Sequence, residues 1–178
     1  MKLEDAIQLL VGKPMVEVYR FLPSLYSWEF GELIQYQSRI TGKTFLDSEL
    51  HLHTENVWRF EDNHRIVVAW HDFFYWAEGK KRDQYDPTLR DKRGKSRGDV
   101  LIGRICKQLP ARTFTVSEVA MDNLGGLRVS FVNGWKLVIF LTTSSPEEAW
   151  RLMDGRSRKH YVCNIPCRKR GLVLTGSK

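Results

Sequence analysis

Residues 127–141, LRVSFVNGWKLVIFL, decide the fold class of this chain. Apolar side chains alternate with polar ones over 127–131, which is the period of a strand with one buried face. Asn133-Gly134 then provides two residues that tolerate positive φ, and an apolar run returns over 135–141. This pattern predicts a β-hairpin, and residues 114–121 are expected to add a third strand beside it.

Strand signals also outnumber helix signals in the rest of the chain. Short β-type runs, separated by turn residues, occupy 15–22, 26–38, 50–53 and 65–70. The spacing of apolar residues predicts a helix over 3–11 and another near 97–109. The sequence therefore predicts an α+β fold, mainly antiparallel β-sheet, with an N-terminal helix and a short helix near 97–109.

A further helix is predicted after the hairpin. Ser145-Pro146-Glu147-Glu148 combines a serine cap, a proline at the first helical position and the acidic residue of a capping box. Gly155 can end such a helix. This pattern places Trp150-Arg151 on a short helix or helical turn.

The Trp-Arg pair occurs twice, at Trp58-Arg59 and Trp150-Arg151, each time followed by an aspartate and a β-type run. We expect a single domain over 1–178, built from similar β-rich halves at about 15–78 and 110–165, with a basic loop at 79–98 between them. Chance recurrence of the pair is the alternative. The tryptophans are expected in the core and the arginines in pairs between the halves, although both residue types also anchor protein interfaces.

The order of these segments resembles a family of small bacterial proteins of unknown function. The first half carries the resemblance in Gly12-Lys13-Pro14, Phe30-Gly31, Leu50-His51-Leu52-His53 and Trp58-Arg59. The second half carries it in residues 127–131, Asn133-Gly134, Glu148-Ala149-Trp150-Arg151-Leu152 and His160-Tyr161-Val162. The resemblance implies a bacterial, cytosolic protein and brings no catalytic assignment with it. Members of the family usually lack so basic a loop and C-terminus.

Composition restricts the class of protein further. The 178 residues are 42% hydrophobic and contain no apolar run long enough to span a membrane. The start MKLEDAIQLL differs from a signal peptide, and three cysteines are too few for a disulfide framework. We expect a cytoplasmic protein that makes no contact with a membrane and folds without a cofactor.

The formal charge of +7 is concentrated in two segments. Residues 79–98 carry eight basic and three acidic side chains, and residues 151–178 carry eight basic and one acidic, whereas residues 1–78 are net acidic. The candidate binding residues are these cations: Lys80, Lys81, Arg82, Arg90, Lys92, Arg93, Lys95, Arg97, Arg156, Arg158, Lys159, Arg168, Lys169 and Arg170.

This charge distribution favours a non-enzymatic binding protein, such as an adaptor, an accessory subunit or an immunity-type protein, that docks an acidic protein partner. Nucleic acid is the alternative partner, because the aromatic run 73–76 directly precedes Lys80-Lys81-Arg82. The run can equally be a core strand. It is also open whether the acidic first half neutralises the basic segments within one molecule.

Metal-dependent chemistry is a third, weaker hypothesis. His51 and His53 share one face of a predicted strand, and His71 lies nearby in the sequence, but no established metal-binding spacing is present. His160, Cys163 and Cys167 fit the spacing of a zinc site poorly. Since GxSxG, GxxxxGK[ST] and GxGxxG are all absent, we assign no catalytic residue and no cofactor.

Overall fold

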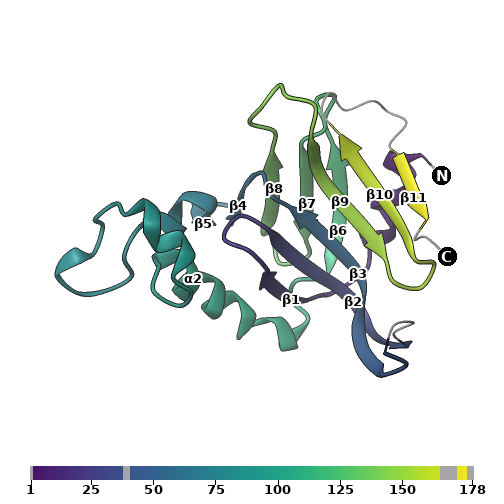
Figure 1. The fold of residues 1–178 in the computed structure, drawn as a ribbon, viewed down its shortest axis with the longest axis horizontal. Coiled ribbons are helices and arrows are strands. Elements are labelled where there is room, and N and C mark those ends of the chain that lie inside the picture. Colours follow the sequence, from purple (N-terminus) through teal and green to yellow (C-terminus); the bar gives the residue numbers. More distant parts are fainter. Residues whose placement is uncertain (1, 38–40, 165–171, 176–178) are drawn as a thin grey trace.

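The computed structural model describes residues 2–37, 41–164 and 172–175, with side chains except at Lys80 and residues 172–175. Two antiparallel sheets face one another (Figure 1). The six-stranded sheet has the order β1 (Met15–Arg20), β2 (Tyr26–Gln37), β3 (Thr44–Thr54), β9 (Glu148–Asp154), β10 (Lys159–Asn164) and β11 (Leu172–Thr175). The five-stranded sheet has the order β5 (Ile66–Ala69), β4 (Val57–Glu61), β8 (Lys136–Phe140), β7 (Leu127–Phe131) and β6 (Val116–Met121). The predicted α+β class is confirmed.

Helices close the two open edges between the sheets. α1 (Leu3–Ile7), extended by the 3-10 turn η1 (Gln8–Leu10), contacts the edge formed by β6 and β10. α2 (Arg97–Cys106), followed by the 3-10 turn η5 (Leu109–Ala111), contacts β1 and β5 at the opposite edge. Both helices predicted near these positions are therefore confirmed. Among the described residues, none of the helices has the length and apolar character that a membrane crossing demands.

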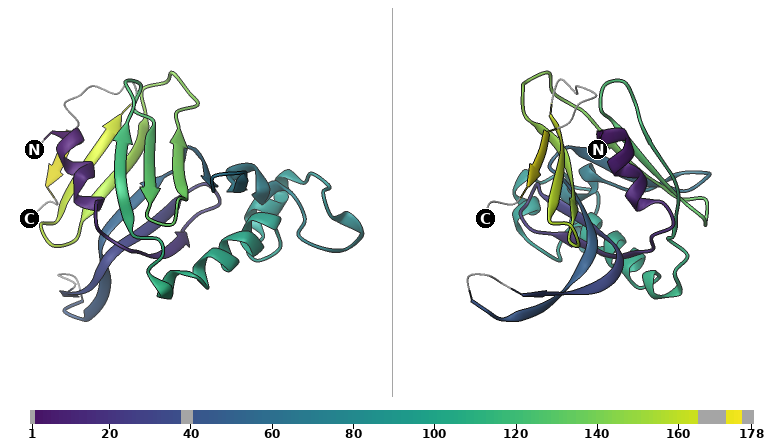
Figure 2. Two further views of the ribbon diagram at one scale, coloured as in Figure 1. Left: turned by 180° about the vertical axis from the view of Figure 1, so that it is seen from behind. Right: turned by 90° about the vertical axis from the view of Figure 1, so that its right-hand side faces the viewer.

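Each half of the chain contributes to both sheets. Strands β1–β3 pair with one another in the six-stranded sheet, after which the chain crosses over and β4 and β5 join β8 of the second half. The second half does the reverse, since β6–β8 lie in the five-stranded sheet and β9 crosses back to pair with β3. Figure 2 shows the two layers from behind and from the side. The halves interlock rather than pack as separate units, and their common ancestry stays a prediction.

The helix predicted from Ser145-Pro146-Glu147-Glu148 is wrong, because this region leads into strand β9. β9 lies between β3 and β10 and pairs with both, so its main chain is hydrogen-bonded on either side. Trp150 and Leu152 are buried on one face and Arg151 and Met153 lie on the other, which is strand periodicity. Pairing with two neighbours outweighs the local capping pattern.

Both Trp-Arg pairs therefore lie on strands that follow a crossover between the sheets. Trp58, on a strand that the sequence did not predict, and Trp150 are fully buried in one core cluster. The Nε1 of Trp150 donates to the carbonyl of Gly125 at 2.7 Å. The expectation that the tryptophans belong to the core is confirmed.

The β2–β3 hairpin sets a register that matters for function. Glu29 lies opposite His51, and Ser27 lies opposite His53. The register shifts beyond Phe30, where Gly31 adopts a φ of +87°. A Cβ at Gly31 would lie 2.5 Å from Oε2 of Glu49, so glycine permits both this backbone conformation and the close contact.

Candidate functional site

The basic segment folds into an arm at one end of the molecule, which we call the basic lobe, residues 75–97. It projects at the far left of Figure 1 and contains the 3-10 turns η3 (Gly79–Lys81) and η4 (Pro87–Asp91). It is held between a preceding turn, η2 (Trp70–Phe74), and the start of α2. The Nη2 of Arg97 reaches Oδ1 of Asp72 at 2.6 Å. The segment is therefore tied to the sheets at both of its ends.

Packing and capping fix the base of the basic lobe. Phe73 is 2% exposed and lies so close to Gly98 that a Cβ there would approach its ring to 2.6 Å. Ser96 caps α2 by accepting from the amide of Asp99, while the Asp99 carboxylate accepts from the amide of Ser96. This reciprocal capping box satisfies two main-chain donors that the helix leaves free. The lobe is thus a packed unit at its base.

Most of the lobe's cations face solvent. Four of them are exposed and make no ion pair with any carboxylate in the described part of the chain: Lys81, Lys92, Arg93 and Lys95. Arg97, in contrast, is paired with Asp72 and Asp83, and Arg82 lies 3.9 Å from Asp83. The side chain of Lys80 lies outside the description. The lobe keeps a surplus of positive charge that its own acids do not neutralise.

The aromatic side chains of this region already contact neighbouring groups. The ammonium groups of Lys81 and Lys92 lie 5.2 Å and 5.6 Å from the ring centre of Trp76. Phe74 is buried and stacks on Tyr85, and Arg90 lies over the rings of Trp70 and Phe74. These contacts use ring surface that base stacking would need.

The described start of the second basic segment lies at the other end of the molecule. The turn between β9 and β10, residues 155–158, is at the opposite end of the long axis from the basic lobe in Figures 1 and 2. Arg156 donates to Glu49 at 2.9 Å and lies 3.6 Å from Glu32, and Arg158 lies over the ring of Tyr36. Lys159 is exposed and has no ion pair within the described residues. Arg168, Lys169 and Arg170 lie outside the described residues.

The arginines of the two Trp-Arg pairs bind carboxylates on their own strands. Arg59 pairs with Glu61 at 2.7 Å, and its guanidinium lies over Phe140 of the neighbouring strand. Arg151 binds both oxygens of Glu148. Arg59 nevertheless connects the halves through Phe140, since β4 and β8 come from different ones.

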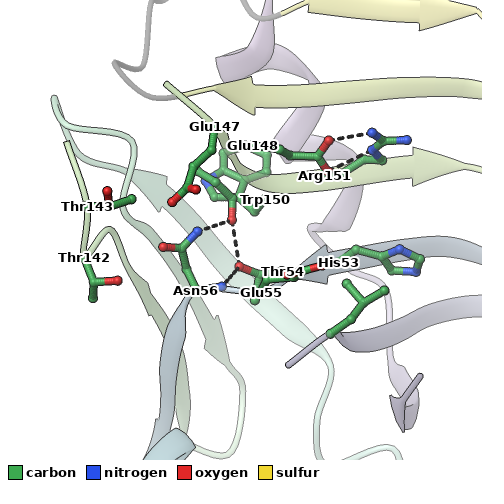
Figure 3. A pocket seen from close by; sticks show the side chains of 12 residues that line it. His53, Thr54, Glu55, Asn56, Thr142, Thr143, Glu147, Glu148, Trp150 and Arg151 are labelled. Atoms are coloured by element: carbon green, nitrogen blue, oxygen red, sulfur yellow. Dashed lines mark hydrogen bonds and ion pairs between the residues drawn. The ribbon is translucent and has the colours of Figure 1, made fainter. Parts of the chain in front are cut away.

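A cavity of about 620 Å³ opens where both crossovers between the sheets meet (Figure 3). Thr54 Oγ1 and Asn56 Nδ2 both donate to the carbonyl oxygen of Ala149, at 2.7 Å and 2.8 Å, which joins the two crossovers. Glu55, Glu147 and Glu148 line the cavity with a single cation, Arg151. Its charge is opposite to that of the basic lobe, so it does not extend the basic surface.

The histidines predicted as metal candidates separate into two places. His51 and His53 lie on the outer face of the six-stranded sheet together with Glu29, which the sequence analysis did not single out. His71 lies on η2, where its ring contacts Trp70 and Phe74. His71 is therefore not part of this group. Glu29 was missed because it is distant in sequence, and only the register of β2 against β3 brings it to His51.

Burial and charge affect the three histidines of this sheet differently. Burial alone would lower the pKa of His51, but its contact with Glu29 outweighs this and raises the pKa. Burial lowers the pKa of His53, and burial together with the charge of Arg151 lowers that of His160. His53 and His160 are thus neutral near pH 7, since the ordinary value is 6.5.

The cysteines do not form a zinc site with His160 in the described residues. Cys163 belongs to the core cluster, whereas the strand alternation of β10 directs His160 to the opposite face. His160 Nδ1 instead lies 3.2 Å from Nη1 of Arg151. Burial raises the pKa of the Cys106 thiol, which keeps it protonated. Cys167 lies outside the described residues.

Comparison of the chain with models of protein families, with curated proteins and with solved structures finds no match. The candidate site therefore depends on the geometry of this chain.

Proposed function

We propose that this protein is a non-enzymatic binding protein that docks an acidic protein partner through the basic lobe. The observation that carries the proposal is the group of exposed cations, Lys81, Lys92, Arg93 and Lys95, without a carboxylate partner in the described residues. Uncompensated charge on a projecting arm attracts a partner of opposite sign and speeds encounter. The described turn between β9 and β10, with Arg156 and Arg158, is not part of this surface, because it lies at the opposite end of the molecule.

A protein partner fits the lobe better than a nucleic acid does. Phe74 is buried and the ring of Trp76 lies against Lys81 and Lys92, so of the three rings Trp76, Phe74 and Tyr85 only that of Tyr85, which is 56% exposed, offers an open face to a base. The guanidinium of Arg93 donates to the carbonyl of Phe21 at 2.6 Å, which brings the lobe against the turn after β1. Phe21 and Leu22 in that turn are 46% and 56% exposed. Arginine and aromatic residues such as Phe21 are enriched in protein interfaces.

The anchoring of the lobe supports the same proposal. The ion pair between Asp72 and Arg97 and the packing of Phe73 against Gly98 hold its base. Cations presented on an anchored arm lose less conformational freedom when a partner binds than cations on a flexible tail. The roles of adaptor, accessory subunit and immunity-type protein all use such a surface.

We place this function in the bacterial cytoplasm. Cys106 is a free thiol, which is the state that a reducing compartment maintains. The bacterial origin depends only on the sequence resemblance.

Affinity capture with the full chain as bait tests the proposal. Bacterial extract, with and without nuclease treatment, is passed over the wild type, over a variant with Lys81, Lys92 and Lys95 changed to Glu, and over a control with Arg128, Arg158 and Lys159 changed to Glu. These control residues are exposed, lie outside the lobe and give the same change in net charge. We expect an acidic protein that the wild type and the control retain and the lobe variant loses.

Two results contradict this expectation. One is a protein partner that the lobe variant retains as well as the wild type does. The other is recovery of nucleic acid alone, disappearing after nuclease treatment and weakening steeply with salt, which assigns the lobe to nucleic-acid binding instead.

A further inference from the structure

A second group of side chains, on the outer face of the six-stranded sheet, carries a separate inference. Glu29 on β2 and His51 and His53 on β3 each direct one potential ligand atom toward a common point, and these atoms all lie within 4.8 Å of one another. Glu29 and His51 are direct cross-strand partners, and His53 is the next residue on the same face. Two rigid neighbouring strands thus supply two imidazoles and one carboxylate.

The burial of this group is unusual for an outer sheet face. Glu29 is 7% exposed and His51 is 9% exposed, although both point away from the core between the sheets. Phe21 contributes to the cover, with its ring centre 5.5 Å from that of His53. Burying ionisable groups costs free energy unless partners compensate them, so this group needs compensating partners where it lies.

The hydrogen bonds around the group orient it as a ligand set. Ser27 Oγ donates to Oε1 of Glu29 at 2.5 Å, which leaves Oε2 directed at Nδ1 of His51. On the other side of that ring, Nε2 of His51 lies 3.5 Å from Oδ1 of Asp47. A carboxylate behind a histidine and a donor behind a carboxylate are the outer contacts that orient metal ligands in proteins.

One nitrogen in the group has no partner. Nε2 of His53 is buried and makes no hydrogen bond with any described residue. A buried imidazole nitrogen without a partner loses its hydration and gains nothing in return. Coordination of a cation by the imidazole would compensate that loss.

We propose that Glu29, His51 and His53 bind one divalent transition-metal ion, with Zn²⁺ as the probe. Two imidazoles and a carboxylate are an established ligand set for zinc and leave a coordination position open. Ligand atoms about 2.1 Å from zinc lie roughly 3.4 Å apart in a tetrahedral site, so small side-chain rotations suffice to close the set. The ion takes the place of the proton between Glu29 and His51, which binding releases.

The charges that face this group include one opposing cation. Arg151 on β9 lies opposite His53, but it binds both oxygens of Glu148, and Asp47 faces His51 from the other side. Together with Glu29, these carboxylates outnumber the guanidinium. The local charge therefore accepts a divalent cation.

Calorimetric titration of chelator-treated full-length protein with Zn²⁺ tests the site. We expect one equivalent to bind to the wild type and binding to weaken by about 100-fold or more in His53→Ala and in the isosteric Glu29→Gln. Ser27→Ala is expected to weaken binding by about tenfold, since it removes only an outer contact. The matched controls are His64→Ala and His71→Ala, which remove exposed histidines outside the group.

Circular dichroism establishes that each variant is folded, and Glu29→Gln carries the test if His53→Ala does not fold. Bound Co²⁺ provides a second readout, because its visible absorption reports nitrogen and oxygen coordination. Failure of the wild type to bind Zn²⁺ overturns the proposal. Zn²⁺ binding that is as tight in Glu29→Gln and Ser27→Ala as in the wild type overturns it as well. Loss of Zn²⁺ binding in His71→Ala has the same consequence.

Discussion

The basic lobe and the turn between β9 and β10 are both rich in cations, but their described cations differ in whether carboxylates hold them. In the basic lobe, Lys81, Lys92, Arg93 and Lys95 are exposed and have no carboxylate partner among the described residues. In the turn between β9 and β10, Arg156 is held by Glu49 and Glu32 from the first half of the chain. Formal charge in a sequence therefore does not measure the charge that a partner can reach.

The difference follows from what surrounds each segment. The turn lies beside the β2–β3 hairpin, whose buried Glu49 also binds Lys13 at 2.8 Å. The lobe projects away from the acidic residues of the sheets, and its own Asp83 is used by Arg97. The acidic first half thus pairs with Arg156 of the turn and leaves the four exposed cations of the lobe without a carboxylate among the described residues.

Phe73→Ala is expected to have the largest effect, because it should destabilise the basic lobe more than the turn between β9 and β10. Phe73 packs against Gly98 and the rings of Tyr26 and Trp58, so its loss leaves a cavity beneath the lobe. The free energy of unfolding should fall by about 3–5 kcal/mol, measured by urea denaturation. Amide hydrogen exchange should increase in residues 75–97 before it increases in residues 155–158. A decrease of less than about 1 kcal/mol in the free energy of unfolding would show that Phe73 does not anchor the lobe.

Asp72→Ala should destabilise the lobe next most strongly. The Asp72 carboxylate accepts from the amide of Ala69 at 2.8 Å and pairs with Arg97, so its loss removes a helix cap and a charged hydrogen bond. We expect a loss of about 2 kcal/mol in the free energy of unfolding. Asp72→Asn, which retains an acceptor oxygen, should lose less. Equal stabilities of the two variants would assign the whole effect to the ion pair.

Glu49→Gln should make the positive charge of the turn between β9 and β10 more accessible, as it is in the basic lobe. The change releases Arg156 and Lys13 from their shared carboxylate at a cost of about 1 kcal/mol in stability, because both cations are partly solvated. On a cation-exchange column, this variant should elute later than Glu118→Gln, which alters net charge equally at an exposed position. Identical elution would mean that Arg156 is equally accessible in the wild type.

The smallest expected effect concerns the pKa of Asp86. Its hydrogen bonds from the hydroxyl and amide of Thr88 at the start of η4 hold its pKa below the ordinary 3.8. A carboxyl with a lowered folded pKa stabilises the fold above its unfolded pKa, and this contribution is lost as pH falls through the folded value. An NMR titration of Asp86 should therefore give a midpoint below 3.8. A midpoint at or above that value would show that the cap does not persist.

Local patterns predicted much of the fold. The strands around Asn133-Gly134, the strands near 15–22 and 26–38, and both edge helices follow from periodicity and turn residues. The strand at 148–154 could not be predicted in this way, because pairing with β3 and β10 determines it. A capping-box sequence has no effect where the main chain is hydrogen-bonded to two neighbouring strands.

The candidate sites were less predictable than the fold. The basic lobe was evident from composition, but nothing in the sequence showed that Glu49 binds Arg156. His51 and His53 were recognisable as neighbours on one strand face, whereas Glu29 required the register of the β2–β3 hairpin. Side-chain groups assembled between strands depend on register, which a single sequence specifies only weakly.

The proposed function requires the cations of the basic lobe to be available to an acidic partner. The most direct measurement is an NMR titration of the full chain with polyglutamate at low salt, following the backbone amide signals. We expect the shifts to concentrate in residues 81–95, to be small in 155–158 and to disappear as salt is added. Unchanged lobe signals, while any other segment responds, would contradict it.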